Sequence, residues 1–143
     1  MLDLELDLVR EADPGETLGD ERWAALARHV LTAEGASGAW SVAVVLVDDA
    51  RLRALHAEFM DVDEPTDVMT FPTGDPGAPG GDIVVSLDRA REQAPEFGLG
   101  YADEVRFLVV HGLLHLCGWD DVTPEARARM LARGAELIAT FAG

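Results

Sequence analysis

The sequence has no lysine, so all of its positive charge comes from arginine. Eleven arginines stand against 27 acidic residues, which leaves a formal net charge of −16 at pH 7. A surface of this sign repels polyanions, because nonspecific binding of nucleic acid depends on cationic side chains that neutralise phosphate. Any nucleic-acid partner therefore has to be held by a local group of arginines or by a metal ion.

Cysteine and long apolar segments are also scarce. Cys117 is the single cysteine, which excludes an intramolecular disulfide and suits a reducing cytoplasm. The longest apolar runs, residues 42–47 and 107–110, are far shorter than the roughly 20 residues that span a bilayer. Residues 1–9 lack the basic start and the apolar stretch of a secretion signal. We therefore expect a cytoplasmic protein without a membrane span or a disulfide partner.

Length and apolar content fit one folded domain. The chain has 143 residues, of which 48% are hydrophobic, and this size is typical of a single core. Segments with the periodicity of strands and of helices are interleaved, without internal repeats or a linker. We predict a single domain over residues 1–143, of the α+β class, with a mixed sheet of about four strands flanked by helices.

Hydrophobic periodicity indicates where the individual elements lie. Period-two alternation and short β-branched runs predict four strands, namely residues 2–9, 42–47, 66–71 and 82–87. Apolar residues three and four apart predict five helices, namely residues 20–35, 49–59, 88–97, 102–117 and 123–141. In the second helix, Leu52, Leu55 and Phe59 are expected to face the core. Glycine and proline concentrated in residues 73–81 predict a surface loop.

The segment V-H-G-L-L-H-L-C-G-W-D-D concentrates residue types that bind metals. His111 and His115 are four residues apart on a predicted helix, so both imidazoles project from one face and can bind one ion. Gly118 is placed to end this helix in a left-handed conformation and to reverse the chain. Asp120 or Asp121 can then supply a third ligand. Three protein ligands and an open position are typical of a catalytic zinc site.

Other histidines and the cysteine have simpler interpretations. Two histidines at this spacing can also be a hydrogen-bonded pair in the core, without a metal. His29 and His56 lie on other predicted helices with no partner pattern, and we interpret them as surface or packing residues. Cys117 is two residues from His115 on the same helix and should face elsewhere, so we interpret it as a packing residue.

The spacing HxxxHxxGxxD is also that of the metzincin proteases, whose helix begins HExxH. In those enzymes the glutamate is the general base next to the metal. Gly112 occupies that position here, so the usual peptidase mechanism lacks its proton acceptor. A metzincin-like metallopeptidase is therefore the second hypothesis.

Three ordered blocks of the sequence resemble the YbeY family of metal-dependent endoribonucleases, which act in ribosomal RNA maturation. HGLLHLCGWDD resembles the family signature HGxLHLxGxDH, residues 65–72 (PTDVMTFP) resemble PTDVLSFP, and residues 81–86 (GDIVVS) resemble GDIxIS. The resemblance extends over approximately residues 44–130. It implies one zinc ion per chain, bound by His111, His115 and the residue at position 121.

Three positions depart from the family pattern. The family usually has a third histidine where this chain has Asp121, an arginine where it has Met60, and an asparagine where it has His56. Two histidines and one aspartate still suit zinc, but the added negative charge lowers the Lewis acidity of the ion. Methionine supplies no positive charge for phosphate, so Arg89, Arg91 or Arg106 would have to replace the arginine. We interpret Met60 as a packing residue at a helix end.

Together these residues predict a zinc-dependent hydrolase, an endonuclease that cleaves RNA phosphodiesters in rRNA processing and ribosome biogenesis. Its expected partner is ribosomal RNA or a ribosomal subunit. Asp120 is the first candidate for proton transfer, and it can equally be a partner that orients a ligand histidine. Glu104, two helical turns before His111, is a second candidate, although a solvated residue that complements the helix dipole is the favoured interpretation. The alternatives are a metzincin-like metallopeptidase and a non-catalytic, metal-binding ribosome-assembly protein.

Overall fold

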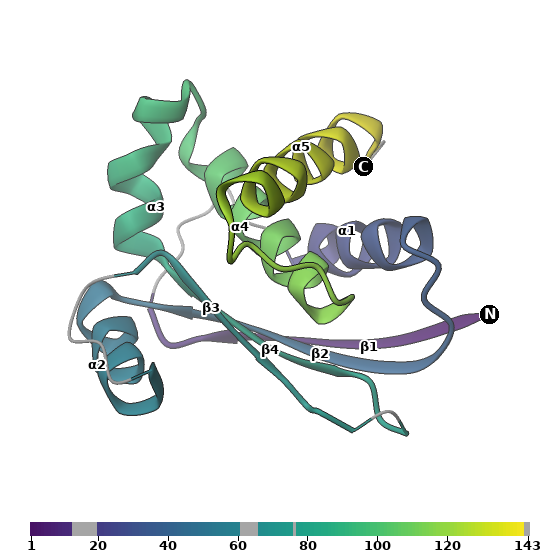
Figure 1. Ribbon diagram of the computed structural model, residues 1–143. Helices are drawn as coiled ribbons and strands as arrows, with labels where there is room; N and C mark the ends of the chain where they lie inside the picture. The colour runs from purple at the N-terminus through teal and green to yellow at the C-terminus, as the bar shows by residue number, and fades with distance from the viewer. Residues whose placement is uncertain (13–19, 61–65, 76, 142–143) are drawn as a thin grey trace.

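One mixed sheet organises the chain. The computed structural model describes residues 1–12, 20–60, 66–75 and 77–141 (Figure 1). The strands are β1 (Leu2–Arg10), β2 (Gly38–Val47), β3 (Val68–Pro72) and β4 (Gly80–Ser86). They lie in the order β1-β2-β4-β3, with β1, β2 and β4 parallel and β3 antiparallel to β4 at one edge. The predicted mixed sheet of four strands is confirmed.

The helices lie on both faces of this sheet. They are α1 (Asp20–Ala33), α2 (Asp49–Met60), α3 (Leu87–Gln93), α4 (Tyr101–Leu116) and α5 (Pro124–Thr140). In Figure 1, α1, α4 and α5 cover one face, and α2 lies against the other. Within the described residues, none of these helices is long and apolar enough to cross a membrane. The α+β class predicted from the alternation of segments is therefore confirmed.

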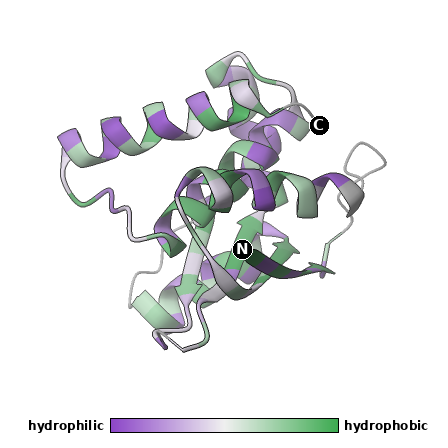
Figure 2. Ribbon diagram, turned by 90° about the vertical axis from the view of Figure 1, so that its right-hand side faces the viewer, coloured by the Kyte–Doolittle hydropathy of each residue, from purple (hydrophilic) through white to green (hydrophobic). Residues whose placement is uncertain are grey.

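Alternate residues of the strands build two apolar layers. Val44, Leu46, Ile83 and Val85 are fully buried in the large core beneath α1, α4 and α5. Residues that point the other way from the sheet, including Val84, form a smaller cluster beneath α2. Figure 2 shows hydrophobic residues on the strands and hydrophilic residues along the outer helices. This arrangement follows from the period of two in a strand, which sends successive side chains to opposite faces.

Two local expectations, the extent of one loop and the orientation of one side chain, need correction. The predicted surface loop at residues 73–81 ends earlier, because Gly80 and Gly81 already pair with β2 as the first residues of β4. An added Cβ at Gly80 would lie 1.9 Å from the carbonyl oxygen of Ser41, so glycine is required there by close strand approach. Phe59 does not face the core: it is 58% exposed near the end of α2, with its ring edge against Phe71.

The helix expected at residues 88–97 is divided. The α-helical part ends at Gln93, and Ala94–Phe97 form a turn of 3-10 helix that is closed by Gly98 with φ 69°. Pro95 explains the change, because its nitrogen has no hydrogen to donate to the preceding turn. The divided helix packs against the first turns of α4 and thereby covers the start of the helix that carries the histidines.

Candidate metal centre

Helix α4 carries both histidines of the motif and lies unusually close to the sheet. A Cβ built on Gly112 would lie 2.5 Å from Cγ2 of Ile83 in β4, well inside van der Waals contact. Glycine at this position therefore lets the helix backbone approach the strand. A glutamate of the HExxH type would clash with Ile83 at this position unless the helix or the Ile83 side chain shifted, which disfavours a peptidase base there.

The end of α4 reverses the chain as the sequence predicts. Gly118 has φ 100°, a left-handed conformation that favours glycine. The amide of Gly118 donates to the carbonyl of His115, and the amide of Trp119 donates to the carbonyl of Leu114, both at 3.0 Å. These two bonds form the Schellman motif that ends many helices. The residues that follow are thereby turned back along the helix.

The reversal brings Asp121 to the histidine pair. Its Oδ2 lies 3.3 Å from Nε2 of His111 and 3.6 Å from Nε2 of His115. The two imidazole rings are 4.9 Å apart and nearly perpendicular. One ligand atom from each residue lies within 4.8 Å of the other two. Ligands of a tetrahedral zinc ion with bonds of about 2.0–2.1 Å are about 3.3 Å apart, so the three groups fit such an ion.

Asp120, the other aspartate of the motif, points elsewhere. It is exposed, and its Oδ1 accepts a hydrogen bond of 3.3 Å from the amide of Val122. This bond lies within the loop that follows α4. Within the described residues, no hydrogen bond joins it to either histidine. Of the two aspartates that the sequence left open as third ligand, the structure thus places Asp121 beside the pair.

The surroundings of both histidines suit a neutral imidazole that can bind a cation. The carbonyl oxygen of Trp119 lies 3.0 Å from Nδ1 of His115 and can only accept, so Nδ1 carries the proton and Nε2 of the neutral ring is free. His111 is 8% exposed. Burial, followed by the nearby charge of His115, lowers the pKa of His111, against an opposing effect from Asp121. The neutral imidazole is the form that ligates metals.

Arg127 is a residue of the site that the sequence analysis did not identify. It lies in the first turns of α5, and its Nη1 is 3.7 Å from Oδ2 of Asp121. This is the same carboxylate oxygen that faces both histidines. The side chain of Arg127 is 59% exposed, so a solvent-accessible cation stands beside the candidate ligands. In the sequence, its position as a basic residue in the predicted helix after the motif was the one indication that Arg127 could belong to the site.

Glu104 is not the solvated residue that the sequence favoured. It is 1% exposed, because α3 and the following turn cover the start of α4. Its Oε1 accepts from Nε2 of Gln93 at 3.2 Å, and the same amide donates to Asp67 at 3.1 Å. Burial raises the pKa of Glu104, and the charge of Asp67 adds to this effect. Its bonded partner among the described residues is Gln93 rather than a ligand histidine.

The arginines proposed to replace the family arginine have other partners. Arg89 pairs with Asp49 at 3.2 Å, Arg106 pairs with Asp103 at 3.1 Å, and Arg91 stacks over the ring of Tyr101. Met60, interpreted as a packing residue, is instead 60% exposed at the end of α2. The three arginines are therefore engaged in contacts with residues of α2 and α4.

Two further residues of the sequence analysis lie outside the centre. His29 packs against α5, where its Nε2 is 2.9 Å from the Thr140 hydroxyl and its ring lies against Phe141. Cys117 is half-buried, and burial with the charge of Glu34 raises the pKa of its thiol to about 11. A thiol with this pKa is poorly suited to metal binding, which requires the thiolate.

Comparison with known proteins agrees with the resemblance of the motifs. The sequence model of the family "Endoribonuclease YbeY" matches residues 10–142. A protein of that name from Symbiobacterium thermophilum is 44% identical over 110 residues, which cover 69% of this chain and 70% of the relative. Another from Thermobifida fusca is 35% identical over 146 aligned positions, with 95% and 93% covered.

A solved structure shows the same fold. The solution structure of TM1509 from Thermotoga maritima superposes with a TM-score of 0.67 at 27% identity, and covers 94% of this chain and 87% of the other. The match of the family model over nearly the full length and the curated relatives lead to one conclusion. This chain belongs to the endoribonuclease YbeY family.

Proposed function

We propose that the protein is a zinc-dependent endoribonuclease that hydrolyses RNA phosphodiesters, with precursor ribosomal RNA as its substrate. One observation carries the proposal: two histidine nitrogens and one carboxylate oxygen converge at the end of α4 in a chain of this family. Curated relatives bear the name Endoribonuclease YbeY. We assign the same activity to this chain because its own residues, His111, His115 and Asp121, can hold the metal ion.

His111, His115 and Asp121 would hold the ion and leave one position open. A zinc ion bound there would acidify a water molecule and polarise a phosphoryl oxygen, which permits hydrolysis near neutral pH. The three side chains contribute one negative charge in total, so a divalent ion would not be neutralised by its ligands. An anionic phosphodiester is attracted to such a centre.

Asp120 is the residue proposed for proton transfer. It is exposed and adjacent in sequence to Asp121, and its Oδ2 has no hydrogen-bond partner among the residues that the structure describes. A carboxylate in this setting can accept a proton from a nucleophile and release it to solvent. Glu104 is less suitable, because it is 1% exposed and its bonded partner is Gln93.

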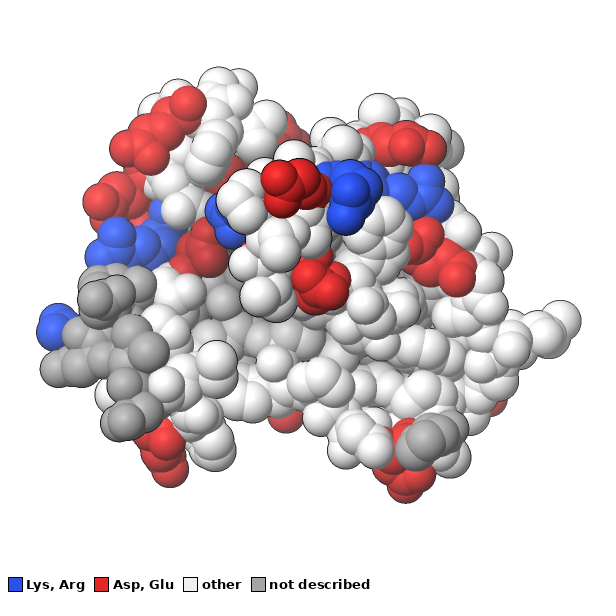
Figure 3. Space-filling model, viewed as in Figure 1, with Lys and Arg blue, Asp and Glu red and all other residues white. Residues whose placement is uncertain are grey.

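RNA has to be bound locally on a strongly acidic protein. In the view of Figure 3, carboxylates and guanidinium groups are interspersed over the helical layer, and the face below it is largely uncharged. No broad basic surface appears on this side. Arg127 beside Asp121 is the cation best placed to contact a phosphate at the centre, because it is exposed and adjoins the candidate ligands.

A specific observation favours one alternative, a ribosome-assembly protein that binds metal and RNA without cleaving it. The family arginine is absent at position 60, and the exposed Met60 provides no charge there. If Arg127 does not compensate, binding can persist while turnover is lost. The two functions share a fold and a metal site but differ in whether RNA is cleaved.

Cleavage assays separate these functions. Zinc-loaded and metal-stripped protein are incubated with structured RNA, single-stranded RNA and casein, with His115→Ala as the control for contaminating ribonuclease. The proposal expects zinc-dependent RNA fragments and intact casein, with both RNAs intact in the variant. RNA binding without fragments would support the assembly protein, and fragments of casein would support a peptidase.

A further inference from the structure

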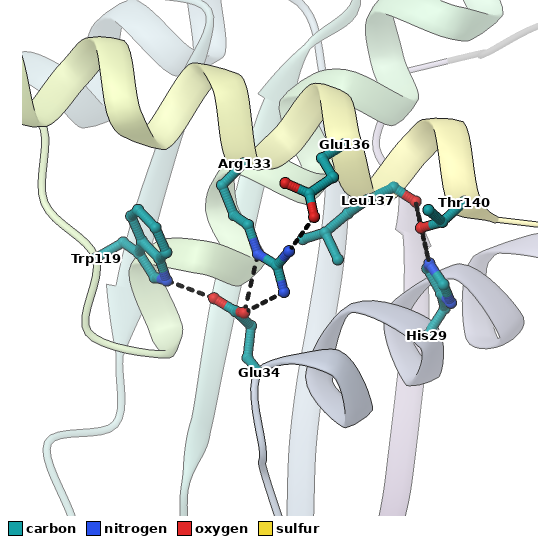
Figure 4. A network of polar contacts seen from close by, with 7 residues as sticks. All are labelled: His29, Glu34, Trp119, Arg133, Glu136, Leu137 and Thr140. Atoms are coloured by element: carbon teal, nitrogen blue, oxygen red, sulfur yellow. Dashed lines mark hydrogen bonds and ion pairs between the residues drawn. The ribbon is translucent and has the colours of Figure 1, made fainter.

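Trp119 connects the candidate metal centre with a distant part of the fold. Its backbone carbonyl accepts the hydrogen bond from Nδ1 of His115 at 3.0 Å. Its indole Nε1 donates to Oε1 of Glu34, which directly follows α1 and is 85 residues away in sequence (Figure 4). Trp119 therefore contacts a candidate ligand through its backbone, and the carboxylate that follows α1 through its side chain.

Glu34 is itself held from α5. Its second oxygen, Oε2, accepts from Nε of Arg133 at 3.2 Å and from Nη2 at 2.9 Å. The side chains of Glu34 and Arg133 are 10% and 24% exposed. Figure 4 shows the carboxylate between the indole and the guanidinium, with one oxygen directed to each. Because this ion pair is mostly buried and each carboxylate oxygen has a defined partner, it holds the Trp119 indole in one position.

The backbone bonds at the end of α4 do not make this attachment redundant. The Schellman bonds fix the amide nitrogens of Gly118 and Trp119. They do not fix the peptide plane that follows Trp119, which contains the carbonyl facing His115 and leads to Asp121. An anchored indole restricts the conformation of Trp119 and thereby the direction of that carbonyl.

We propose that Glu34, with Arg133, is a positioning residue for the metal centre and acts through Trp119. By holding the indole, Glu34 keeps the Trp119 carbonyl on Nδ1 of His115, which leaves Nε2 deprotonated and turned toward Asp121. Hydrogen bonds of this kind fix the tautomer and orientation of ligand histidines. The inference rests on the proposed role of His115 as a ligand, and concerns residues outside the motif.

The test compares three variants of the full chain. Glu34→Ala removes the acceptor of the indole, and Trp119→Phe removes the indole donor but leaves the Glu34–Arg133 pair intact. Glu136→Ala is the matched control, because Glu136 also pairs with Arg133, at 2.9 Å, but does not touch Trp119. Zinc affinity is measured by competition with a chromophoric chelator, and the His115 tautomer by ¹⁵N NMR of the metal-free protein at constant alkaline pH.

We expect zinc affinity about tenfold or more weaker in Glu34→Ala and Trp119→Phe, and unchanged in Glu136→Ala. The tautomer with the proton on Nδ1 should dominate in the wild type and in the control, and mix with the other tautomer in the first two variants. A general loss of stability would not shift the tautomer of folded protein.

Unchanged zinc affinity or an unchanged tautomer in Trp119→Phe would overturn the inference. If Glu34→Ala does not fold, Trp119→Phe alone decides, since it retains the ion pair. The tautomer measurement needs no metal. A wild type that binds no zinc would therefore contradict the proposed function, while the NMR comparison still decides the positioning role.

Discussion

Gly112 and Ile83 determine how closely the histidine helix lies on the sheet. The 2.5 Å that would separate a Cβ at position 112 from Cγ2 of Ile83 is too short for a side chain unless Ile83 or the helix shifts. This contact sets the height of α4 above β4, and the neighbouring His111 lies with its Nε2 3.3 Å from Oδ2 of Asp121. The glycine that replaces the metzincin glutamate is thus a packing requirement of this fold.

Gly112→Ala should destabilise the protein by about 1–3 kcal/mol, because the added methyl group overpacks the interface with Ile83. The intrinsic helix preference of alanine offsets part of this, by up to about 1 kcal/mol. Urea unfolding monitored by circular dichroism measures the change.

Gly134→Ala is the matched control for that experiment. A Cβ at Gly134 in α5 would have its nearest neighbours at 3.7–4.0 Å, which is ordinary contact. This variant should be as stable as the wild type or more stable by about 0.5–1 kcal/mol. Equal effects of the two alanines would show that the approach of α4 to β4 is not tight.

Asp121 should contribute far more to zinc affinity than its neighbour Asp120. Asp121→Ala removes the oxygen that faces both histidines, so zinc affinity should fall by orders of magnitude. Asp121→His should restore binding through a third imidazole. Asp120→Ala should retain the ion and lose RNA cleavage. Calorimetric zinc titration of the three variants decides, and loss of zinc in Asp120→Ala alone would reverse the assignment.

Glu104 should make stability depend on pH. Burial raises its pKa above the ordinary 4.5, so the folded protein holds this proton more tightly than the unfolded chain. The resulting stability is fully present below about pH 4.5 and is lost as pH rises through the higher pKa of the folded state. Glu104→Gln cannot ionise, so its stability relative to the wild type should increase from pH 4 to pH 8.

Denaturant titrations at the two pH values measure this difference. Glu96→Gln, an exposed glutamate in the turn before α4, serves as the control and should keep a constant difference from the wild type. A pH-independent difference for Glu104→Gln would mean that the carboxyl group is hydrated in the folded protein.

Arg127 should contribute to RNA binding and not to metal binding. Arg127→Ala removes a charged hydrogen-bond donor, so RNA affinity should fall about tenfold, and the salt dependence should decrease by about one phosphate contact. Zinc affinity should not fall, because the arginine competes for Asp121 rather than supporting it. Filter binding at several salt concentrations measures both effects.

Arg129 provides the comparison on the same helix. It lines a hollow of about 340 Å³ formed with Cys117–Asp120 and Ala126, and has no ion pair among the described residues. Arg129→Ala removes the same charge at a position that does not touch Asp121. If both variants weaken RNA binding equally, the effect is that of net charge, and Arg127 is no specific phosphate contact.

Local sequence patterns predicted much of the fold. The alternation of Leu2 to Leu8, the β-branched run at 42–47 and the cap formed by Thr123 and Pro124 each specify their element through neighbouring residues. The early start of β2 at Gly38 was missed because residues 38–41 have no alternation of their own, and pair with β1 through the backbone.

The part of the site that lies within one short segment of the chain could be predicted from the sequence. The helical spacing of His111 and His115 and the stop at Gly118 lie within one segment, so their geometry follows from the helix and its end. Contacts across the fold were not predictable. The burial of Glu104 depends on packing by α3, and the contact of Glu34 with Trp119 joins the residues that follow two separate helices, α1 and α4.

His111, His115 and Asp121 should together bind one zinc ion. Metal analysis of the purified wild type, His111→Ala and His115→Ala measures this binding. We expect one zinc per wild-type chain and almost none in either variant, because losing one of three protein ligands leaves too few donors. All three proteins should remain folded, since a core of this size does not require the metal. Full zinc content in both variants would show that the two histidines are not metal ligands.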